Sequence, residues 1–220
     1  MTFGTYMLSC AARTRLRQRT IAHLRTTDWP QTPVLILEDP ASSEIPLWRQ
    51  MSLAHAVLTR ALREGADIIL MLEDDLIFNA HLRHNIEHWA PLRRLASAGH
   101  HFFGSLFRPC TALKTVDTTL AYGEADGNRA QGSQALLISR ATVSYLVGSW
   151  GSYPATHVDL KLARLAARVC SIVYHVPSLV QHVGVESVWG GRFIAAPDFE
   201  PEWKALESCA SFATKHQRSS

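Results

Sequence analysis

Hydrophobic and polar positions along the chain predict alternating helices and strands. Apolar residues run without interruption from Ile68 to Leu72, which is typical of a strand buried on both faces inside a parallel sheet. Residues 47–63 instead place apolar side chains every three or four positions, which predicts a helix with one buried face. Gly65 then supplies the C-terminal cap of that helix. Helix, glycine and buried strand together form the αβ unit of a parallel sheet.

The remaining periodicities extend this architecture over the rest of the chain. Further strands are predicted over residues 4–10, 34–37, 101–107, 132–140 and 172–176, the last of these being the final strand. Further helices are predicted over residues 13–27, 81–97, 141–147 and 160–169, and residues 108–129 are expected to form a long loop that covers a ligand. We therefore expect one α/β, Rossmann-like domain over residues 1–200, with a central, mostly parallel sheet flanked by helices. Residues 201–220 are expected to form a peripheral tail.

Length, charge and cysteine usage limit the classes of protein to which this chain could belong. A chain of 220 residues with 47% hydrophobic content fits one domain with a sizeable core. The net charge of +3 is too small to require nucleic acid as a partner. The four cysteines lie far apart, which indicates neither a zinc site nor a disulfide framework and favours a reducing compartment.

The N-terminal residues lack the charged and apolar regions of a signal peptide. No stretch of the chain approaches the roughly 20 apolar residues that a membrane span needs. We therefore expect a soluble, cytoplasmic protein of a bacterial or viral type.

Three consecutive carboxylates, Glu73, Asp74 and Asp75, follow the buried strand directly. Ligands of open α/β sheets bind outside the carboxyl ends of the strands. Adjacent carboxylates repel one another unless a cation or hydrogen-bond donors offset their charges. The pattern therefore predicts a site for Mn²⁺ or Mg²⁺, although solvated acidic residues at a strand end would look the same.

The sequence Leu-Glu-Asp-Asp-Leu at positions 72–76 resembles the metal-binding motif of the GT-A fold glycosyltransferases, in the Glu-Asp-Asp variant of their DXD motif. A second segment, Pro-Ser-Leu-Val-Gln-His-Val-Gly at positions 177–184, resembles the late segment of such enzymes whose histidine completes the metal shell. The resemblance covers roughly residues 4–190. It implies a Mn²⁺ or Mg²⁺ cofactor held by Asp75 and His182, with Glu73 or Asp74 supporting the ribose or metal-bound water of a nucleotide-sugar donor, a UDP-sugar above all.

The same resemblance gives roles to other residues of the chain. Arg13 would lie at the nucleotide base and diphosphate and Asp39 at the ribose, although a solvated helix start and a turn are the preferred explanations of these two residues. Ser133 and Gln134 would contact the sugar, or belong to an ordinary core strand. Asp159 would be the general base of an inverting enzyme, or orient the acceptor in a retaining one, and its position also suits the first turn of a helix. Glu186 and Trp189 would form a closing loop at the acceptor.

Several alternatives remain open at this point. A Mg²⁺-dependent nucleotidyltransferase would use the same carboxylates, although the glycine-rich phosphate loops GxxxxGK and GxGxxG are absent after the first predicted strand. A non-catalytic nucleotide-binding or interaction domain is a further alternative. The acceptor is most simply a saccharide, and a modified DNA base is the other candidate. The sequence leaves the oligomeric state open.

Overall fold

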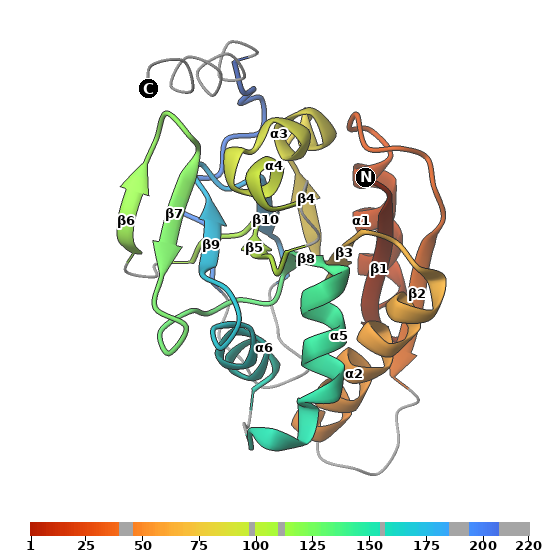
Figure 1. The fold of residues 1–220 in the computed structure, drawn as a ribbon. Coiled ribbons are helices and arrows are strands. Elements are labelled where there is room, and N and C mark those ends of the chain that lie inside the picture. Colours follow the sequence, from red (N-terminus) through yellow and green to blue (C-terminus); the bar gives the residue numbers. More distant parts are fainter. Residues whose placement is uncertain (40–45, 97–99, 110–112, 155–156, 185–193, 207–220) are drawn as a thin grey trace, which may run out of the picture.

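A computed structural model describes residues 1–39, 46–96, 100–109, 113–154, 157–184 and 194–206. Within these residues an eight-stranded sheet has the order β2-β1-β3-β8-β5-β9-β7-β6, and a smaller sheet pairs β10 with β4 (Figure 1). The strands of the large sheet are β1 (Phe3–Cys10), β2 (Val34–Asp39), β3 (Ile68–Leu72), β5 (Phe103–Ser105), β6 (Leu113–Asp117), β7 (Tyr122–Ala125), β8 (Ala135–Ser139) and β9 (Ile172–His175). The small sheet consists of β4 (Leu76–Phe78) and β10 (Val180–His182).

Most strands of the large sheet point the same way. Strands β2, β1 and β3 are parallel neighbours, as are β5 and β9. Strand β8 is antiparallel to both β3 and β5, and β7 is antiparallel to both β9 and β6. Six strands therefore share one direction and two oppose it, which confirms the predicted α/β domain with a mostly parallel sheet.

Helices cover both faces of this sheet. The helices are α1 (Thr14–Leu24), α2 (Pro46–Glu64), α3 (Leu82–His88), α4 (Ala90–Ala96), α5 (Arg140–Gly148) and α6 (Val158–Ala166), with 3-10 turns η1 (Ala11–Arg13) and η2 (Trp150–Ser152). One hydrophobic cluster joins the sheet to α2, α5 and α6, which lie together in Figure 1. The other cluster joins the opposite face to α1, α3 and α4.

Strand β3 shows why its sequence is apolar without interruption. Ile69 and Met71 contribute to the cluster with α2, α5 and α6. Ile68, Leu70 and Leu72 contribute to the cluster on the other face. Because successive side chains of a strand point to opposite faces, a strand between two helical layers needs an apolar residue at every position. Gly65 precedes this strand with a φ of +79°, as expected for a glycine cap.

Three of the predicted elements differ from the structure. The sequence predicts a second buried strand over residues 34–37, but strand β2 lies at an edge of the sheet and is only partly buried, and its Ile36 side chain is 37% exposed. Residues 108–129 are not a structureless loop, because β6 and β7 form an antiparallel pair there that extends the sheet. Strand β9 is not the last strand, since β10 follows it and pairs with β4.

The chain beyond residue 200 packs on α3 and on the end of β4. The Asn79 amide donates hydrogen bonds to the carbonyls of Glu200 and Trp203, at 2.7 and 2.8 Å. Asn85 donates to the Trp203 carbonyl at 2.9 Å and accepts from the Ala205 amide at 2.9 Å. These contacts continue past the domain boundary predicted at residue 200, and most of the predicted tail lies outside the described residues. No helix in the described part of the chain is both long and apolar enough to cross a bilayer.

Candidate metal and donor site

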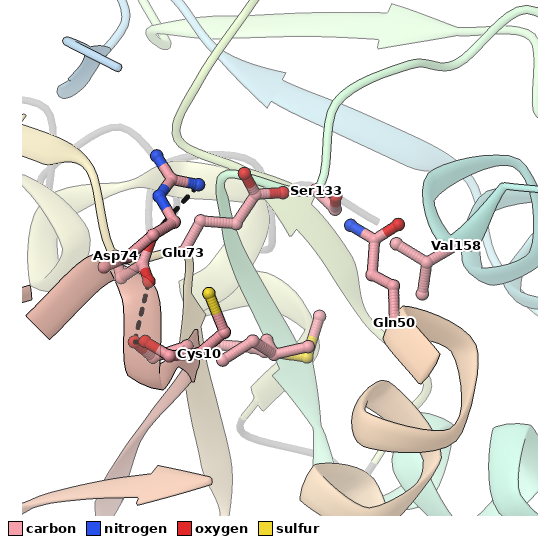
Figure 2. Close-up of a pocket in the computed structure, with 10 residues that line it drawn as sticks. Cys10, Gln50, Glu73, Asp74, Ser133 and Val158 are labelled. Atoms are coloured by element: carbon pink, nitrogen blue, oxygen red, sulfur yellow. Dashed lines mark hydrogen bonds and ion pairs between the residues drawn. The ribbon is translucent and has the colours of Figure 1, made fainter. Parts of the chain in front are cut away.

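Glu73 takes its position from the pairing of β3 with β8. Its backbone N–H donates to the Gln134 carbonyl at 2.9 Å, which continues the β3–β8 ladder by one residue. The Ser133 hydroxyl donates to Glu73 Oε1 at 2.6 Å. Figure 2 shows the two side chains beside each other, with Gln50 of α2 directed into the same space. The end of β8 therefore delivers a hydroxyl to the first carboxylate of the acidic motif.

Asp74 turns toward β1 and the first turn that follows it. Its Oδ2 accepts a hydrogen bond from the Ser9 hydroxyl at 2.7 Å, and its Oδ1 lies 3.3 Å from Arg13 Nη1. The Asp74 carbonyl also accepts from the Thr20 hydroxyl at 2.9 Å. Asp74 is buried. Its contacts join the acidic motif to β1, η1 and α1.

Asp75 meets His182, which lies 107 positions later in the chain. His182 Nε2 is 2.8 Å from Asp75 Oδ2. The antiparallel β4–β10 pair aligns Leu76 with His182, and the Val183 N–H donates to the Asp75 carbonyl at 2.9 Å. The small sheet thus brings the second resembling segment to the first.

Arg13 and Gly184 close the space around Asp75. Arg13 Nη2 forms an ion pair with Asp75 Oδ2, so this buried guanidinium contacts both aspartates of the motif. A Cβ added to Gly184 would overlap Asp75 Oδ2 and would lie 3.0 Å from Arg13 Nη2. Position 184 therefore needs a glycine because of this close approach.

Burial and neighbouring charges shift the pKa values of these groups. Burial, followed by the charge of Asp75, raises the pKa of Glu73 to about 7, and burial also raises the pKa of Asp74. Burial opposes ionisation of Asp75, yet the hydrogen bond and charge of His182, together with Arg13, leave the Asp75 pKa lowered. Burial likewise opposes the charged form of His182, but Asp75 leaves the His182 pKa raised. Negative charge is therefore concentrated on Asp75, and Glu73 ionises near neutral pH.

The chemistry of this cluster fits a divalent cation. Glu73, Asp75 and His182 each offer one ligand atom, and these atoms lie within 4.8 Å of one another. Ligands on one Mg²⁺ lie about 3 to 4 Å apart, so small side-chain movements bring the three atoms onto one ion. Asp75 Oδ1 is buried and has no hydrogen-bond partner among the described residues. The two carboxylates suit Mn²⁺ or Mg²⁺, and the imidazole nitrogen favours Mn²⁺, because Mg²⁺ takes oxygen ligands.

A cavity of about 160 Å³ opens beside this cluster. Its lining includes seven residues predicted for the site: Arg13, Glu73, Asp75, Ser133, Gln134, Asp159 and His182. Asp74 and Asp39 do not line it, and Asp39 is buried 3.4 Å from Arg49 in an ion pair. Glu186 and Trp189 lie outside the described residues. The cavity thus brings together both predicted metal ligands, four of the six predicted donor residues and the predicted catalytic Asp159.

Comparisons with known proteins add a likeness of fold. No protein-family model matches the chain, and no curated protein matches its sequence. The structure is similar to A197 from STIV, with a TM-score of 0.54 at 12% identity, over 82% of this chain and 86% of that chain. Mannose-1-phosphate geranyltransferase from Thermus thermophilus aligns with a TM-score of 0.43 at 12% identity, over 80% of this chain and 74% of that chain. S. aureus TarS in complex with UDP-GlcNAc aligns with a TM-score of 0.46 at 12% identity, over 79% of this chain and 58% of that chain. The likeness to A197 shows a shared fold.

Asp159 enters the cavity wall from the first turn of α6. Its Oδ2 accepts a hydrogen bond from the Gly132 N–H at 3.1 Å, and its Oδ1 accepts from the Leu160 N–H at 2.8 Å. Gly132 has a φ of +92°, a conformation that glycine adopts without strain. The left-handed turn at Gly132 therefore ties Asp159 to the segment before β8 that carries Ser133.

The first turn of α2 adds residues that the sequence interpretation did not assign to the site. Leu47 and Gln50 line the cavity. The three- and four-residue periodicity of this helix revealed its buried face but not where its N-terminal turn would lie. His157, the N-cap residue of α6, also lines the cavity. The signal in the sequence that could have placed His157 in the site is its position two residues before Asp159.

Proposed function

We propose that the protein is a metal-dependent glycosyltransferase that moves a sugar from a nucleotide-sugar donor to an acceptor hydroxyl. The donor is a UDP-sugar and the acceptor is a saccharide. One observation carries this proposal: Glu73, Asp75 and His182 converge at the end of β3, on a cavity that Asp159 also lines. A cation ligand set and a separate carboxylate then share one space, which suits metal-assisted sugar transfer to a hydroxyl.

Asp75, His182 and Glu73 would hold Mn²⁺ or Mg²⁺ in this site. When bound, the cation neutralises negative charge on the departing nucleoside diphosphate. Ser133 keeps Glu73 oriented through its hydrogen bond of 2.6 Å. Arg13 holds the two aspartates in place and presents a guanidinium to the cavity, and guanidinium geometry suits phosphate oxygens.

Gln134 is suited to bind the sugar. Its Oε1 is buried and has no hydrogen-bond partner among the described residues. A buried acceptor without a donor costs free energy, and a sugar hydroxyl in the cavity would supply that donor. Gln134 also lines the cavity that contains the ligand set. This arrangement supports its assignment as a sugar-binding residue.

Asp159 would accept the proton of the acceptor hydroxyl if the enzyme inverts the anomeric carbon, and would orient the acceptor if it retains. Its two backbone hydrogen bonds fix the carboxylate in the cavity wall. Each oxygen keeps a second lone pair for the acceptor hydroxyl. We expect Asp159→Asn to bind donor like the wild type and to transfer less sugar. An inverting enzyme would lose its base, and a retaining enzyme would lose one of the two carboxylate oxygens that orient the acceptor.

Thermal unfolding with ligands tests the proposal. UDP, GDP, CMP and their sugars are compared in Mn²⁺ and in EDTA, on the wild type, on Asp75→Asn and on Glu202→Gln, which removes an exposed carboxylate. A ligand that binds the native state raises the melting temperature. We expect one nucleotide and its sugar to stabilise the wild type and Glu202→Gln only with Mn²⁺, and Asp75→Asn to lose this stabilisation. No stabilisation by any nucleotide would overturn the proposal.

Product analysis separates an enzyme from a binding domain. With the stabilising nucleotide sugar, Mn²⁺ and a panel of saccharides, we expect nucleoside diphosphate to be released by the wild type and by Glu202→Gln. The donor should raise the melting temperature of Asp159→Asn, but this variant should release little nucleoside diphosphate. Donor binding without release or transfer would instead indicate a non-catalytic nucleotide-binding domain.

A further inference from the structure

A second cavity of about 530 Å³ lies along α6, outside the candidate metal site. Its walls come from the C-terminal half of α6, the residues after β7 and the start of β9. Its volume falls in the range of small-molecule sites, about 300–1,000 Å³. We call this cavity the α6 cleft.

The charges in the α6 cleft are unequally compensated. Its two carboxylates have partners: Asp126 pairs with Lys114 at 3.7 Å, and Glu124 accepts hydrogen bonds from Tyr122 and from Ser171 at 2.8 Å. Arg164 and Arg168 also line the cleft, and neither forms an ion pair within the described part of the chain. The cleft therefore presents two guanidinium groups without a counterion from the described residues.

The two arginines are held in position by uncharged groups. The Arg164 guanidinium lies over the Tyr153 ring, 5.3 Å from its centroid, and Arg168 Nη1 donates to the Ser152 hydroxyl at 2.9 Å. Arg164 Nε is buried and lacks a hydrogen-bond acceptor among the described residues. An oxyanion in the cleft would supply hydrogen-bond acceptors and a counter-charge for the guanidinium groups that line it.

The α6 cleft and the candidate metal site are joined by short stretches of chain. Asp159 lines the metal-site cavity from the first turn of α6, and Arg164 lines the cleft from the last turn. A nine-residue helix is about 13 Å long. Asp159 and Arg164 are therefore about 8 Å apart along the axis of α6. Asn128 lines the cleft and Gln131 the metal-site cavity, only three positions later.

We infer that the α6 cleft binds the phosphate or carboxylate group of an acidic saccharide acceptor. This inference rests on the proposed glycosyl transfer, because it places the acceptor hydroxyl at Asp159 and the anionic part of the same acceptor at Arg164 and Arg168. The guanidinium pair selects oxyanions. The cleft has the volume of a small-molecule site, which suits sugar units and not a nucleic-acid duplex.

Calorimetric titration of the full chain tests this site without donor or metal. The probes are inorganic pyrophosphate and glucuronic acid, each in EDTA, and the variants are Arg164→Gln/Arg168→Gln and Arg168→Gln alone. Arg63→Gln, at an exposed position of α2, is the matched control for lost charge. We expect at least one probe to bind the wild type and Arg63→Gln saturably, and to bind the double variant about tenfold more weakly or worse. If the double variant unfolds, Arg168→Gln alone tests the site, because it replaces an exposed side chain. We expect this single variant to show a smaller loss of probe affinity.

Asp75→Asn distinguishes the two cavities, because it alters the metal site and leaves the α6 cleft unchanged. Equal affinity in Asp75→Asn and the wild type is expected. Three results would each overturn the inference. Asp75→Asn could lose affinity for the probe, the double variant could keep it, or the wild type could bind neither probe. Displacement of the probe by a short DNA duplex, but not by acidic oligosaccharides, would overturn the saccharide assignment. Since the titration contains no metal or nucleotide, its result is independent of the donor-binding test of the proposed function.

Discussion

Binding of Mn²⁺ to this protein should release protons, because two of the three ligand groups hold protons near neutral pH. Burial and the charge of Asp75 raise the pKa of Glu73 to about 7, so much of this carboxyl group is protonated at pH 6. Burial opposes the charge of His182, but the hydrogen bond and charge of Asp75 raise the His182 pKa overall. A carboxylate and a neutral imidazole bind metals, whereas their protonated forms do not. The cation must therefore displace protons from Glu73 and from His182.

The size of the effect follows from the Glu73 pKa of about 7. About one tenth of Glu73 is ionised at pH 6 and about nine tenths at pH 8, which weakens Mn²⁺ binding about tenfold at the lower pH, or about 1.4 kcal/mol. Release of the His182 proton adds to this dependence. We therefore expect the logarithm of the Mn²⁺ dissociation constant to change by about one to two per pH unit below pH 7.

Calorimetry measures this proton release directly. Titrations with Mn²⁺ at the same pH, in two buffers that differ in ionisation enthalpy, give the number of protons released. Glu73→Gln should bind Mn²⁺ more weakly and release about one proton fewer below pH 7, whereas Glu202→Gln should match the wild type. A dissociation constant that stays the same between pH 6 and pH 8 would refute the assignment of Glu73 and His182 as ligands.

Three further predictions concern the site and the stability of the fold. Gly184→Ala should weaken Mn²⁺ binding about tenfold with an unchanged circular dichroism spectrum, because its Cβ would overlap the Asp75 carboxylate; Gly148→Ala, which has open space around it, is the control. Burial lowers the pKa of His175 to about 4, so the unfolded state binds more protons between pH 6.5 and 4, and urea titrations should show about 3 kcal/mol of stability lost over that range. His175→Gln should remove this pH-dependent loss, and an unchanged slope would contradict the reasoning. Asn85→Ala should lower the free energy of unfolding by about 1–3 kcal/mol, since it leaves backbone groups of the C-terminal segment unpaired; equal urea midpoints would show that these bonds contribute nothing.

The sequence predicted those parts of the fold that local patterns encode. The uninterrupted apolar run correctly predicted β3 and its burial on both faces, because β3 lies between two helical layers. The three- and four-residue periodicity correctly predicted α2 and its one buried face. Strand β6 was missed because an edge strand needs little burial, and its Val116 side chain is 55% exposed. Strand β10 was missed because its three residues carry no periodicity, and its pairing with β4 joins segments about 100 positions apart.

In the candidate site, too, local patterns predicted some residues and missed those that contacts between distant segments bring together. The three carboxylates could be found from their place after a buried strand, and His182 was found only through a resemblance, since no local pattern ties it to Asp75. The structure gives the physical link: the Val183 N–H bonds to the Asp75 carbonyl, one residue before the β4–β10 pair begins. Neither Arg13 nor Gly184 could be placed at Asp75 from sequence, because both contacts depend on how η1 and the end of β10 meet.

Arg13 offsets part of the repulsion among the three adjacent carboxylates of the acidic motif. Its guanidinium is buried and contacts Asp74 and Asp75, and His182 contacts Asp75 from another side. These positive groups offset the repulsion that buried carboxylates would otherwise suffer. Because Asp75 Oδ1 keeps no hydrogen-bond partner among the described residues, this compensation is incomplete on the side where a cation would bind. A divalent cation would complete this compensation at Asp75, as the proposed binding of a metal–nucleotide complex requires.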